Sequence, residues 1–323
     1  MLDAAIIGLG WWGQRLVNAV QGSGLIRFAR GVTLEPELAR EFAAKCGLTI
    51  GTSYEDVLAD PAIQAVVLAT PHTGHRAQVE AAAAAGKHVY CEKPFALCRA
   101  DAQAMLDACA RARVTIAVGH HFRLMPSMKA LRREVASGAL GAIMHVEGNY
   151  SHDWLKDLPV DSWRAAPEES RAGGMTGMGI HLLDCFRDVA GPMRRVSALS
   201  TRRALPLPTG DTTAALVEFA SGATGTLATT LKTPFDWRLA VYGENAWAAS
   251  VSETRLVVCR AGGEPQATDF APANHLGENV ELFAAAVLGR EKFPIDAAGI
   301  LQTVSALDAV FRSVDADGVW QAV

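Results

Sequence analysis

Three glycines near the amino end of the chain have the spacing of a dinucleotide-binding loop. Residues 5–14 read AIIGLGWWGQ, so Gly8, Gly10 and Gly13 form the pattern G-x-G-x-x-G. In such loops one glycine makes the turn, one lets phosphates approach the backbone, and one lets the helix pack on the strand. The phosphates bind the free N–H groups of the helix N-terminus. The pattern alone is weak, but here it follows an apolar strand and opens a helix, which is the context it requires.

The end of the second predicted strand decides which dinucleotide fits. An acidic residue there binds the ribose 2′-hydroxyl of NAD, whereas a small hydroxyl or a basic residue tolerates the 2′-phosphate of NADP. Thr33 stands at this position, and Glu35 follows it. Thr33 can bond a phosphate and Glu35 would repel one, while Arg30 is a nearby cation. We therefore expect NAD or NADP, with a slight preference for NADP.

Strands and helices alternate over the first 120 residues. Apolar runs predict strands at 4–8, 25–34, 62–71, 88–94 and 114–120. Helical spacing, with glycines just past several ends, predicts helices at 13–24, 36–47, 76–86 and 100–113. This alternation is typical of a parallel sheet with helices on both faces.

The pattern changes after residue 120. A helix at 126–138 and a strand at 142–150 lead to a glycine-rich segment that enters a helix at 173–191. Turn residues predict hairpins within 214–232 and 239–251, and consecutive hairpins indicate an antiparallel sheet. We expect two domains, 1–120 and 121–323, with the last helix packing back on the first domain.

Composition excludes several classes of protein. The chain has 323 residues, a net charge of −4 and 20% charged residues, so nothing indicates a nucleic-acid partner. No apolar run reaches the ~18 residues of a membrane span, and no basic segment precedes the first strand, which favours a cytoplasmic protein. Six cysteines without a C-x-x-C pair indicate reduced thiols rather than a metal or disulfide framework: Cys46, Cys91, Cys98, Cys109, Cys185 and Cys259.

Several segments together make the chain resemble a known family, the oxidoreductases grouped around glucose–fructose oxidoreductase and inositol dehydrogenase (GFO/IDH/MocA). The matching segments are GLGWWG (8–13), ATPHTGH (69–75), AGKHVYCEKPFAL (85–97), VGHHFRLMP (118–126), GALGAI (138–143), WR (163–164) and GGMTGMGIHLLD (173–184). The resemblance implies an α/β protein: an NAD(P)-binding Rossmann domain, then a substrate-binding α+β domain. The second domain is expected to have a large, open, mostly antiparallel sheet that is often used to form oligomers.

The resemblance also implies roles for individual residues of the first domain. Lys93, in CEKP, matches a lysine that touches both substrate and cofactor and takes part in catalysis, although a loop lysine on the surface is the alternative. The Lys93–Pro94 bond is expected to be cis. Residues near the cofactor are expected to be Gly8, Gly10, Trp11, Trp12, Gly13, Thr33, Thr70, Pro71, His72, His75, Glu92 and Lys93. No metal is expected, because the histidines do not have the spacing of a metal site.

In the second domain, His181 matches the catalytic histidine of the family. An imidazole titrates near neutrality, so it can accept a hydroxyl proton as hydride leaves. Asp184 stands three residues later on the same helical face, where it either orients His181 or caps local N–H groups. Residues near the family's substrate positions, each with packing or a surface ion pair as the alternative, are Arg123, Tyr150, Trp163 and Arg164. Lys93, His181 and Asp184 are expected to contact the substrate as well.

The chain departs from the family at one position. Many members carry an aspartate one helical turn before the histidine, and that position is Gly177 here. Either Lys93 and His181 alone handle the proton, or the substrate differs. A roomier and less anionic pocket favours an acidic, aromatic or glycosylated substrate over a simple polyol.

The resemblance implies hydride transfer between a nicotinamide and a secondary alcohol or ketone of a sugar, cyclitol, sugar acid or related ring. Two alternatives remain. One is a dihydrodiol or aromatic-acid diol dehydrogenase of the same family, and the other is a non-catalytic binding protein that senses NAD(P) or a sugar. The expected partners are a small-molecule substrate and further copies of the chain in a homodimer or homotetramer.

Overall fold

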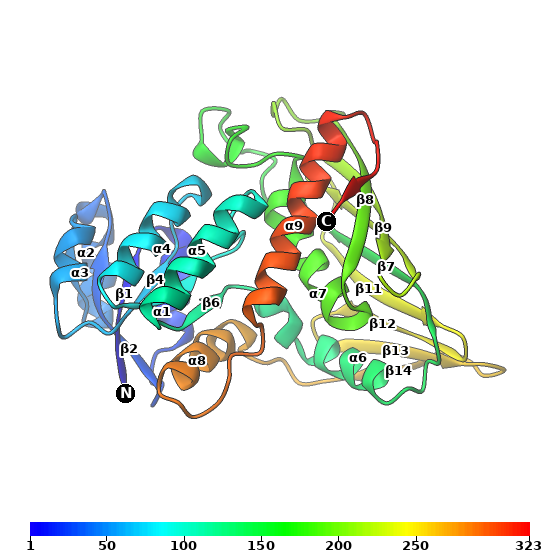
Figure 1. The fold of residues 1–323 in the computed structure, drawn as a ribbon, viewed down its shortest axis with the longest axis horizontal. Coiled ribbons are helices and arrows are strands. Elements are labelled where there is room, and N and C mark those ends of the chain that lie inside the picture. The colour runs from blue at the N-terminus through cyan, green and yellow to red at the C-terminus, as the bar shows by residue number, and fades with distance from the viewer. The chain divides into compact units, whose positions relative to one another are not determined.

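A computed structural model describes all 323 residues, which form two compact units (Figure 1). The first unit comprises Met1–His121 and Asn274–Ile300, and the second comprises Phe122–Ala273 and Leu301–Val323. The chain passes from the first unit to the second after His121, one residue beyond the boundary expected at 120. The segment 274–300 belongs with the amino-terminal unit, which no local pattern in the sequence indicates.

The first unit is built on a parallel sheet of six strands. In spatial order they are β3 (Thr49–Gly51), β2 (Ile26–Val32), β1 (Leu2–Ile7), β4 (Ala65–Leu68), β5 (His88–Cys91) and β6 (Ile116–Val118). All four residues of β4 are buried, as expected of a central strand covered on both faces. The predicted parallel sheet is confirmed, and it brings the ends of β1, β2, β4 and β5 to one edge.

The helices of the first unit are α1 (Trp11–Ala19), α2 (Pro36–Cys46), α3 (Tyr54–Ala59), α4 (His75–Ala84), α5 (Arg99–Ala112) and α8 (His275–Val287). Helix α8 is attached to this unit by two side-chain bonds. The Tyr90 hydroxyl donates to Asn279 Oδ1 at 2.7 Å, and Asn274 Nδ2 donates to the Ala19 carbonyl at 2.7 Å. The helix that returns to the first unit is thus α8, whereas most of the last helix, α9 (Ala297–Asp315), belongs to the second.

The second unit contains a nine-stranded sheet. In spatial order the strands are β14 (Gln266–Asp269), β13 (Arg255–Arg260), β12 (Ala246–Ser252), β11 (Asp236–Gly243), β7 (Ile143–Ser151), β10 (Thr224–Thr230), β9 (Thr212–Phe219), β8 (Met193–Thr201) and β15 (Gln321–Ala322). Every pair is antiparallel except β7 and β10. Both predicted hairpins are present, as β9–β10 and β11–β12.

Helices α6 (Pro126–Ala136), α7 (Ile180–Ala190) and α9 lie on the same side of the large sheet (Figure 1). Helix α7 approaches β7 closely because Gly148 has no side chain, and an added Cβ there would lie 2.9 Å from the Phe186 ring. The opposite face is open and carries Leu199 and Leu216, which are 61% and 50% exposed. None of the helices in either unit combines the length and the apolar character that crossing a membrane requires.

Candidate functional site

Two of the three loop glycines are required by the packing of the protein itself. Gly8 has φ +93°, and an added Cβ would lie 2.5 Å from the Ala69 carbonyl oxygen. A Cβ on Gly13 would lie 2.0 Å from the Gly8 carbonyl oxygen. A side chain at Gly8 would therefore clash with the segment after β4, and one at Gly13 would push α1 away from the turn after β1.

Gly10 is different, because a Cβ there would meet no protein atom within 4 Å. It is the N-cap of α1, no side chain caps this helix end, and no acidic residue stands in the first turn. The space at Gly10 and the N–H groups of the helix end form the cradle that an anionic phosphate needs. The residues present therefore fit a dinucleotide pyrophosphate.

Aromatic and basic side chains surround the start of α1. The Arg15 guanidinium lies 5.2 Å from the Trp11 ring centroid and 5.4 Å from that of Trp12. The Trp12 ring also lies 5.7 Å from His121, which stacks on His275 with 4.9 Å between centroids. Trp11 and Trp12 were predicted from the sequence, whereas Arg15 and His275 were not, since their positions depend on how α1 and α8 pack.

The end of β2 carries the residues expected to discriminate between the two cofactors. Thr33 follows β2 directly, and its Oγ1 accepts the backbone N–H of Glu35 at 3.2 Å. Arg30 Nη1 forms an ion pair with Asp60 at 3.0 Å. Because Asp60 already balances its charge, Arg30 is expected to attract a 2′-phosphate less strongly than the sequence alone indicates.

His75 braces two loops at the edge of the parallel sheet. The side chain is fully buried, its Nδ1 lies 3.0 Å from the Pro94 carbonyl oxygen, and its Nε2 lies 3.2 Å from the Thr70 carbonyl oxygen. It thus ties the turn after β4, which includes Pro71 and His72, to the segment after β5. This arrangement favours a structural role for His75, and the expected cis Lys93–Pro94 bond is present.

Glu92 lies beneath this edge and is only 4% exposed. Gly119 makes room for it, since an added Cβ would lie 2.6 Å from Glu92 Oε1. Burial raises the pKa of the Glu92 carboxyl, and the positive charge of Lys93 partly offsets that rise. The next residue, Lys93, is half-buried at the carboxyl end of β5, where ligands bind in open parallel sheets.

In the second unit, His181 is held against an aromatic ring. It is the second residue of α7 and is 3% exposed. Its imidazole stacks on Phe122, with centroids 4.1 Å apart and planes inclined by 15°. Tyr150, at the end of β7, lies 6.2 Å from the imidazole and 5.2 Å from the Phe122 ring. Phe122 was missed from the sequence, where only its histidine and arginine neighbours were considered.

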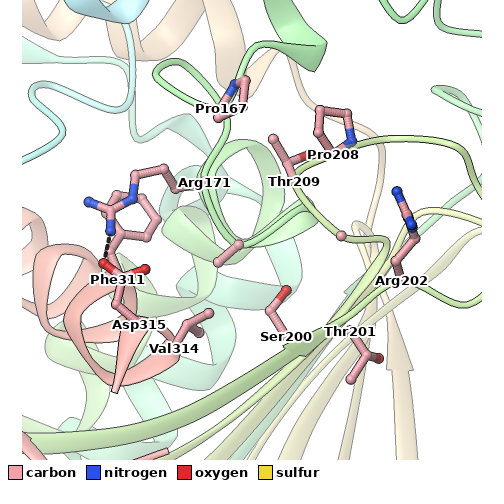
Figure 2. Close-up of a pocket in the computed structure, with 12 residues that line it drawn as sticks. Pro167, Arg171, Ser200, Thr201, Arg202, Pro208, Thr209, Phe311, Val314 and Asp315 are labelled. Carbon is pink, nitrogen blue, oxygen red and sulfur yellow. Dashed lines mark hydrogen bonds and ion pairs between the residues drawn. The ribbon is translucent and has the colours of Figure 1, made fainter. Parts of the chain in front are cut away.

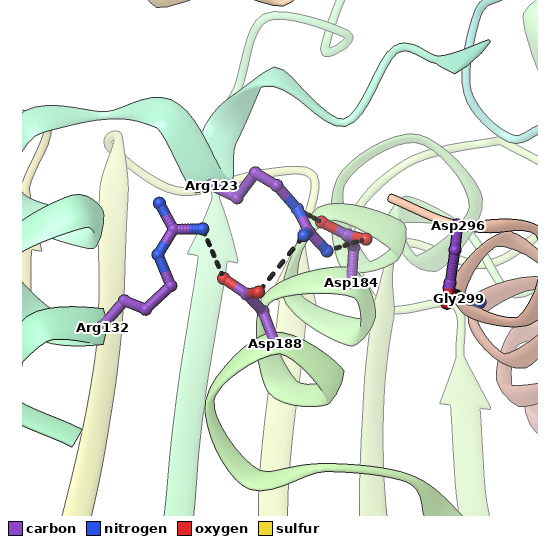
Figure 3. A network of polar contacts seen from close by, with 6 residues as sticks. All are labelled: Arg123, Arg132, Asp184, Asp188, Asp296 and Gly299. Carbon is purple, nitrogen blue, oxygen red and sulfur yellow. Dashed lines mark hydrogen bonds and ion pairs between the residues drawn. The ribbon is translucent and has the colours of Figure 1, made fainter. Parts of the chain in front are cut away.

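Arg123 and Asp184 form a buried bidentate ion pair (Figure 3). Arg123 Nε lies 2.8 Å from Asp184 Oδ2 and Nη2 lies 2.7 Å from Oδ1, and both side chains are 1% exposed. Asp188 extends the network to Arg123 Nη1 at 3.2 Å and to Arg132 at 3.4 Å. The nearby carboxylates raise the pKa of Arg123 against the opposing effect of its burial. This burial favours a structural role for Arg123 and Asp184 over the substrate contact expected of them.

The segment before His181 is a π-helix, Met175–Gly179. Such segments are frequent at functional sites. An added Cβ at Gly177 would meet nothing within 4 Å, whereas one at Gly179 would lie 2.2 Å from the Met175 sulfur. Gly177 therefore leaves real space one turn before His181.

Trp163 and Arg164 lie in the 3-10 turn Trp163–Ala165, and the Arg164 guanidinium lies 4.3 Å from the Trp163 ring centroid. Burial lowers the pKa of Arg164. Both side chains are half-buried. Their predicted contact with substrate therefore stays a prediction.

The second unit also contains an open cavity of about 570 Å³ (Figure 2). It lies between α9, the end of β8 and the loop before the π-helix, where Arg171 forms an ion pair with Asp315. No residue that the sequence predicted for the site lines this cavity. We therefore do not assign it to the catalytic site.

Two family models match the chain. Residues 2–120 match the oxidoreductase family with an NAD-binding Rossmann fold, and residues 128–249 match the GFO/IDH/MocA C-terminal domain. Levoglucosan dehydrogenase of Pseudarthrobacter phenanthrenivorans is 34% identical over 167 residues, which is 51% of this chain and 43% of that protein. In such matches the chain spans about half the length of the curated relatives.

Solved structures resemble the chain over its whole length. An oxidoreductase domain protein from Kribbella flavida superimposes with a TM-score of 0.92 at 23% identity, covering 100% of this chain and 99% of that one. Levoglucosan dehydrogenase in complex with NADH and levoglucosan gives a TM-score of 0.89 at 24% identity, with the same coverage. These structures establish the fold. Because the two family models cover most of the chain, the protein is a member of the GFO/IDH/MocA oxidoreductase family with an NAD-binding Rossmann domain.

Proposed function

We propose that the protein is an NAD(P)-dependent oxidoreductase that acts on a secondary alcohol or ketone of a sugar, cyclitol, sugar acid or related ring. The observation that carries this proposal is His181, a buried imidazole fixed by Phe122 at the start of α7. The stack holds the imidazole plane in one orientation, which a proton acceptor at a defined position requires.

The reaction needs a hydride acceptor and a proton acceptor. When bound, the nicotinamide supplies the site that gains or loses the hydride. In the oxidation, His181 accepts the proton of the substrate hydroxyl while the carbon loses its hydride. In the reduction, protonated His181 returns that proton to the alkoxide oxygen. Lys93 is assigned the second proton-handling role, donating a hydrogen bond to the reacting oxygen.

The first unit supplies the cofactor cradle. Gly10 and the N-terminus of α1 would hold the pyrophosphate, with Trp11 and Trp12 beside it. Thr33 would face the ribose, and the turn after β4 would contact the nicotinamide half through Thr70, Pro71 and His72.

Both dinucleotides fit the end of β2, and we keep a slight preference for NADP. Thr33 offers a hydroxyl where NAD-specific sites place a carboxylate. The ion pair between Arg30 and Asp60, together with the exposed Glu35, limits the preference. We expect the two dissociation constants to differ by less than about tenfold, which corresponds to ~1.4 kcal/mol.

The open face of the large sheet supports a homodimer or homotetramer. Leu199 and Leu216 are exposed there, and their neighbours in the register, Ala214 and Ser197, are small. Light scattering coupled to size exclusion tests this proposal, since Leu216→Arg should shift the mass toward the monomer.

A turnover screen tests the proposed activity. Sugars, cyclitols, sugar acids, glycosides and dihydrodiols would each be offered with NAD⁺ and NADP⁺, and the reduced nicotinamide would be followed by absorbance. Turnover of a ring alcohol supports the proposal. Binding of a sugar and a dinucleotide with no turnover in either direction would favour the sensing alternative instead.

A further inference from the structure

A continuous row of aromatic rings leads away from His181 in the second unit. From Phe122 and Tyr150 it continues to Phe235, whose ring centroid lies 6.2 Å from that of Tyr150. It also continues through His152, which lies 5.5 Å from Tyr150 and stacks on Trp154 at 4.3 Å. We call Tyr150, His152, Trp154 and Phe235 the aromatic row.

Strand register explains why these rings share one face. Tyr150 of β7 lies opposite Trp237 of β11, and the two ring centroids are 5.6 Å apart. His152 and Phe235 stand two residues from this pair, just outside the ends of β7 and β11, and both rings stay close to Tyr150, at 5.5 Å and 6.2 Å. The row therefore lies on the helix-covered face of the sheet and extends beyond the ends of β7 and β11.

The backbone fixes the outer end of the row. The His152 N–H donates to the Thr230 carbonyl at 3.1 Å, and the Thr230 N–H donates to Ser151 Oγ at 2.9 Å. The Trp154 N–H donates to His152 Nδ1 at 3.2 Å. These bonds hold the His152–Trp154 segment of the row in place.

Exposure rises steeply along the row. Tyr150 and His152 are 6% and 5% exposed, whereas Trp154 and Phe235 are 63% and 55% exposed. The rings of Trp154 and Phe235 stack with centroids 5.9 Å apart and planes inclined by 16°, and each remains more than half exposed. Large rings held open to water at the end of a buried row indicate a binding surface.

The length of the row suits an additional ring of the substrate. Two steps of 6.2 Å link His181 to Phe235 through Tyr150, so these two rings lie close enough for one ligand of two linked six-membered rings to reach both. Gly177 leaves space on the His181 side. Flat aromatic faces recognise the apolar face of a pyranose or an aryl group, which needs no charge partner. The charged side chains next to Trp154 already pair with each other, Lys156 Nζ lying 2.9 Å from Asp153.

We propose that Trp154 and Phe235 form a subsite for the second ring of a glycoside whose reacting sugar lies at His181. This proposal rests on the proposed function for the position of the reacting sugar. The second ring is either another sugar or an aryl aglycone, since both present a flat apolar face.

Three probes with the same sugar separate these possibilities: methyl β-D-glucopyranoside, phenyl β-D-glucopyranoside and cellobiose. Binding to the complex with NADH is measured by saturation-transfer NMR and titration, and oxidation is measured with NAD⁺ and NADP⁺. We expect the two-ring probes to bind at least about fivefold more tightly than the methyl glycoside. A preference for the phenyl glycoside alone indicates an aryl subsite, and a preference for cellobiose alone indicates a sugar subsite.

Substitutions of single residues then test which side chains cause the preference for two-ring probes. Trp154→Ala and Phe235→Ala should each raise KM or Kd for the preferred probe about five- to tenfold, with kcat and methyl glycoside binding unchanged. Trp154→Phe should restore most of the loss. Trp320→Ala is the matched control, because Trp320 is 40% exposed and lies under Arg195 at the β8–β15 edge. Melting temperatures confirm that each variant folds.

The outcomes separate this inference from the proposed function. Two-ring preference that Trp154→Ala removes, without any turnover, supports the subsite and counts against the proposed activity. Turnover with equal affinity for all three probes, or a preference that survives both alanine variants, overturns the subsite and leaves the activity standing. Failure of the two-ring probes to bind overturns it as well.

Discussion

The imidazole of His181 lies flat against the ring of Phe122, with 4.1 Å between centroids and 15° between planes. The next residue, Arg123, forms its bidentate ion pair with Asp184, three residues after His181. Consecutive residues of one 3-10 turn, His121–Leu124, therefore fix both the first turn of α7 and the ring plane of its histidine. Stacking sets the plane, and the buried ion pair sets the position of the helix.

Phe122→Ala should lower kcat about tenfold or more, because an imidazole without its stacked ring samples orientations that do not meet the substrate. Dinucleotide affinity should not change. Phe122→Tyr keeps the ring and serves as the control. Steady-state kinetics at several pH values measures both the loss of kcat and any displacement of the acidic limb of the pH–rate profile. Unchanged kcat and pH profile in Phe122→Ala would show that the stack has no positioning role.

Asp184→Ala should destabilise the second unit by roughly 3–5 kcal/mol, since it leaves the Arg123 charge buried and unpaired. Replacing both partners with apolar residues, as in Arg123→Met with Asp184→Leu, should recover much of that loss. Denaturant unfolding measures the free energies. Glu37→Ala removes an exposed ion pair with Arg40 and should have little effect. If Asp184→Ala lowers the free energy of unfolding no more than Glu37→Ala does, the network in Figure 3 contributes little to stability.

Local sequence features predicted the elements that local physics determines. The glycine loop, the buried strand β4 and the two hairpins each depend on residues close together in the chain. Phe122 and Arg123 could not be assigned in this way, because their partners His181 and Asp184 are about sixty residues away and the contact depends on how η2, the turn His121–Leu124, meets α7. The strand β3 has only three residues and no alternation to detect.

The substrate-contact predictions for Arg123 and Asp184 show a related limit. Residue type and family position indicate a charged side chain near the site, but they do not reveal whether that charge is already neutralised. Gly10 and Gly13 also show that residue type does not reveal the surroundings of a side chain. Both are glycines of one motif, yet only Gly13 is required by the protein's own packing, and only coordinates distinguish them.

The first unit should lose stability as the pH falls. His121 lies 2.9 Å from His275 between their Nδ1 atoms, and burial together with the positive charges of His275, Lys93, His120 and Arg15 holds the pKa of His121 well below its usual value. Because the folded pKa is depressed, the unfolded chain binds the extra proton first. The contribution is complete above about pH 6.5 and is lost below it.

His121→Gln should therefore flatten the dependence of the unfolding free energy between about pH 8 and pH 5. His145→Gln, on the large sheet of the second unit, is the control that removes another histidine. Denaturant titrations at a series of pH values give the comparison. An identical slope in wild type and His121→Gln would mean that this histidine does not govern the acid sensitivity.

Thr33→Asp should shift the cofactor preference toward NADH by about tenfold or more, because the new carboxylate binds the ribose 2′-hydroxyl and repels a 2′-phosphate. Fluorescence titration with NADH and NADPH measures both dissociation constants. Thr49→Asp, at the neighbouring edge strand β3, adds the same charge as a control. Tighter NADH binding by the wild type would reverse the preference that we propose, and equal effects of both variants would remove Thr33 from the ribose site.

The most direct test of the account is the rate of hydride transfer in His181→Ala, measured in a single turnover with the substrate that the wild type oxidises best and with saturating cofactor. We predict a loss of about a hundredfold to ten-thousandfold with an unchanged dissociation constant for the dinucleotide, as expected when the proton acceptor alone is removed. A rate within a few-fold of the wild type would contradict the assignment of His181 and, with it, the proposed mechanism.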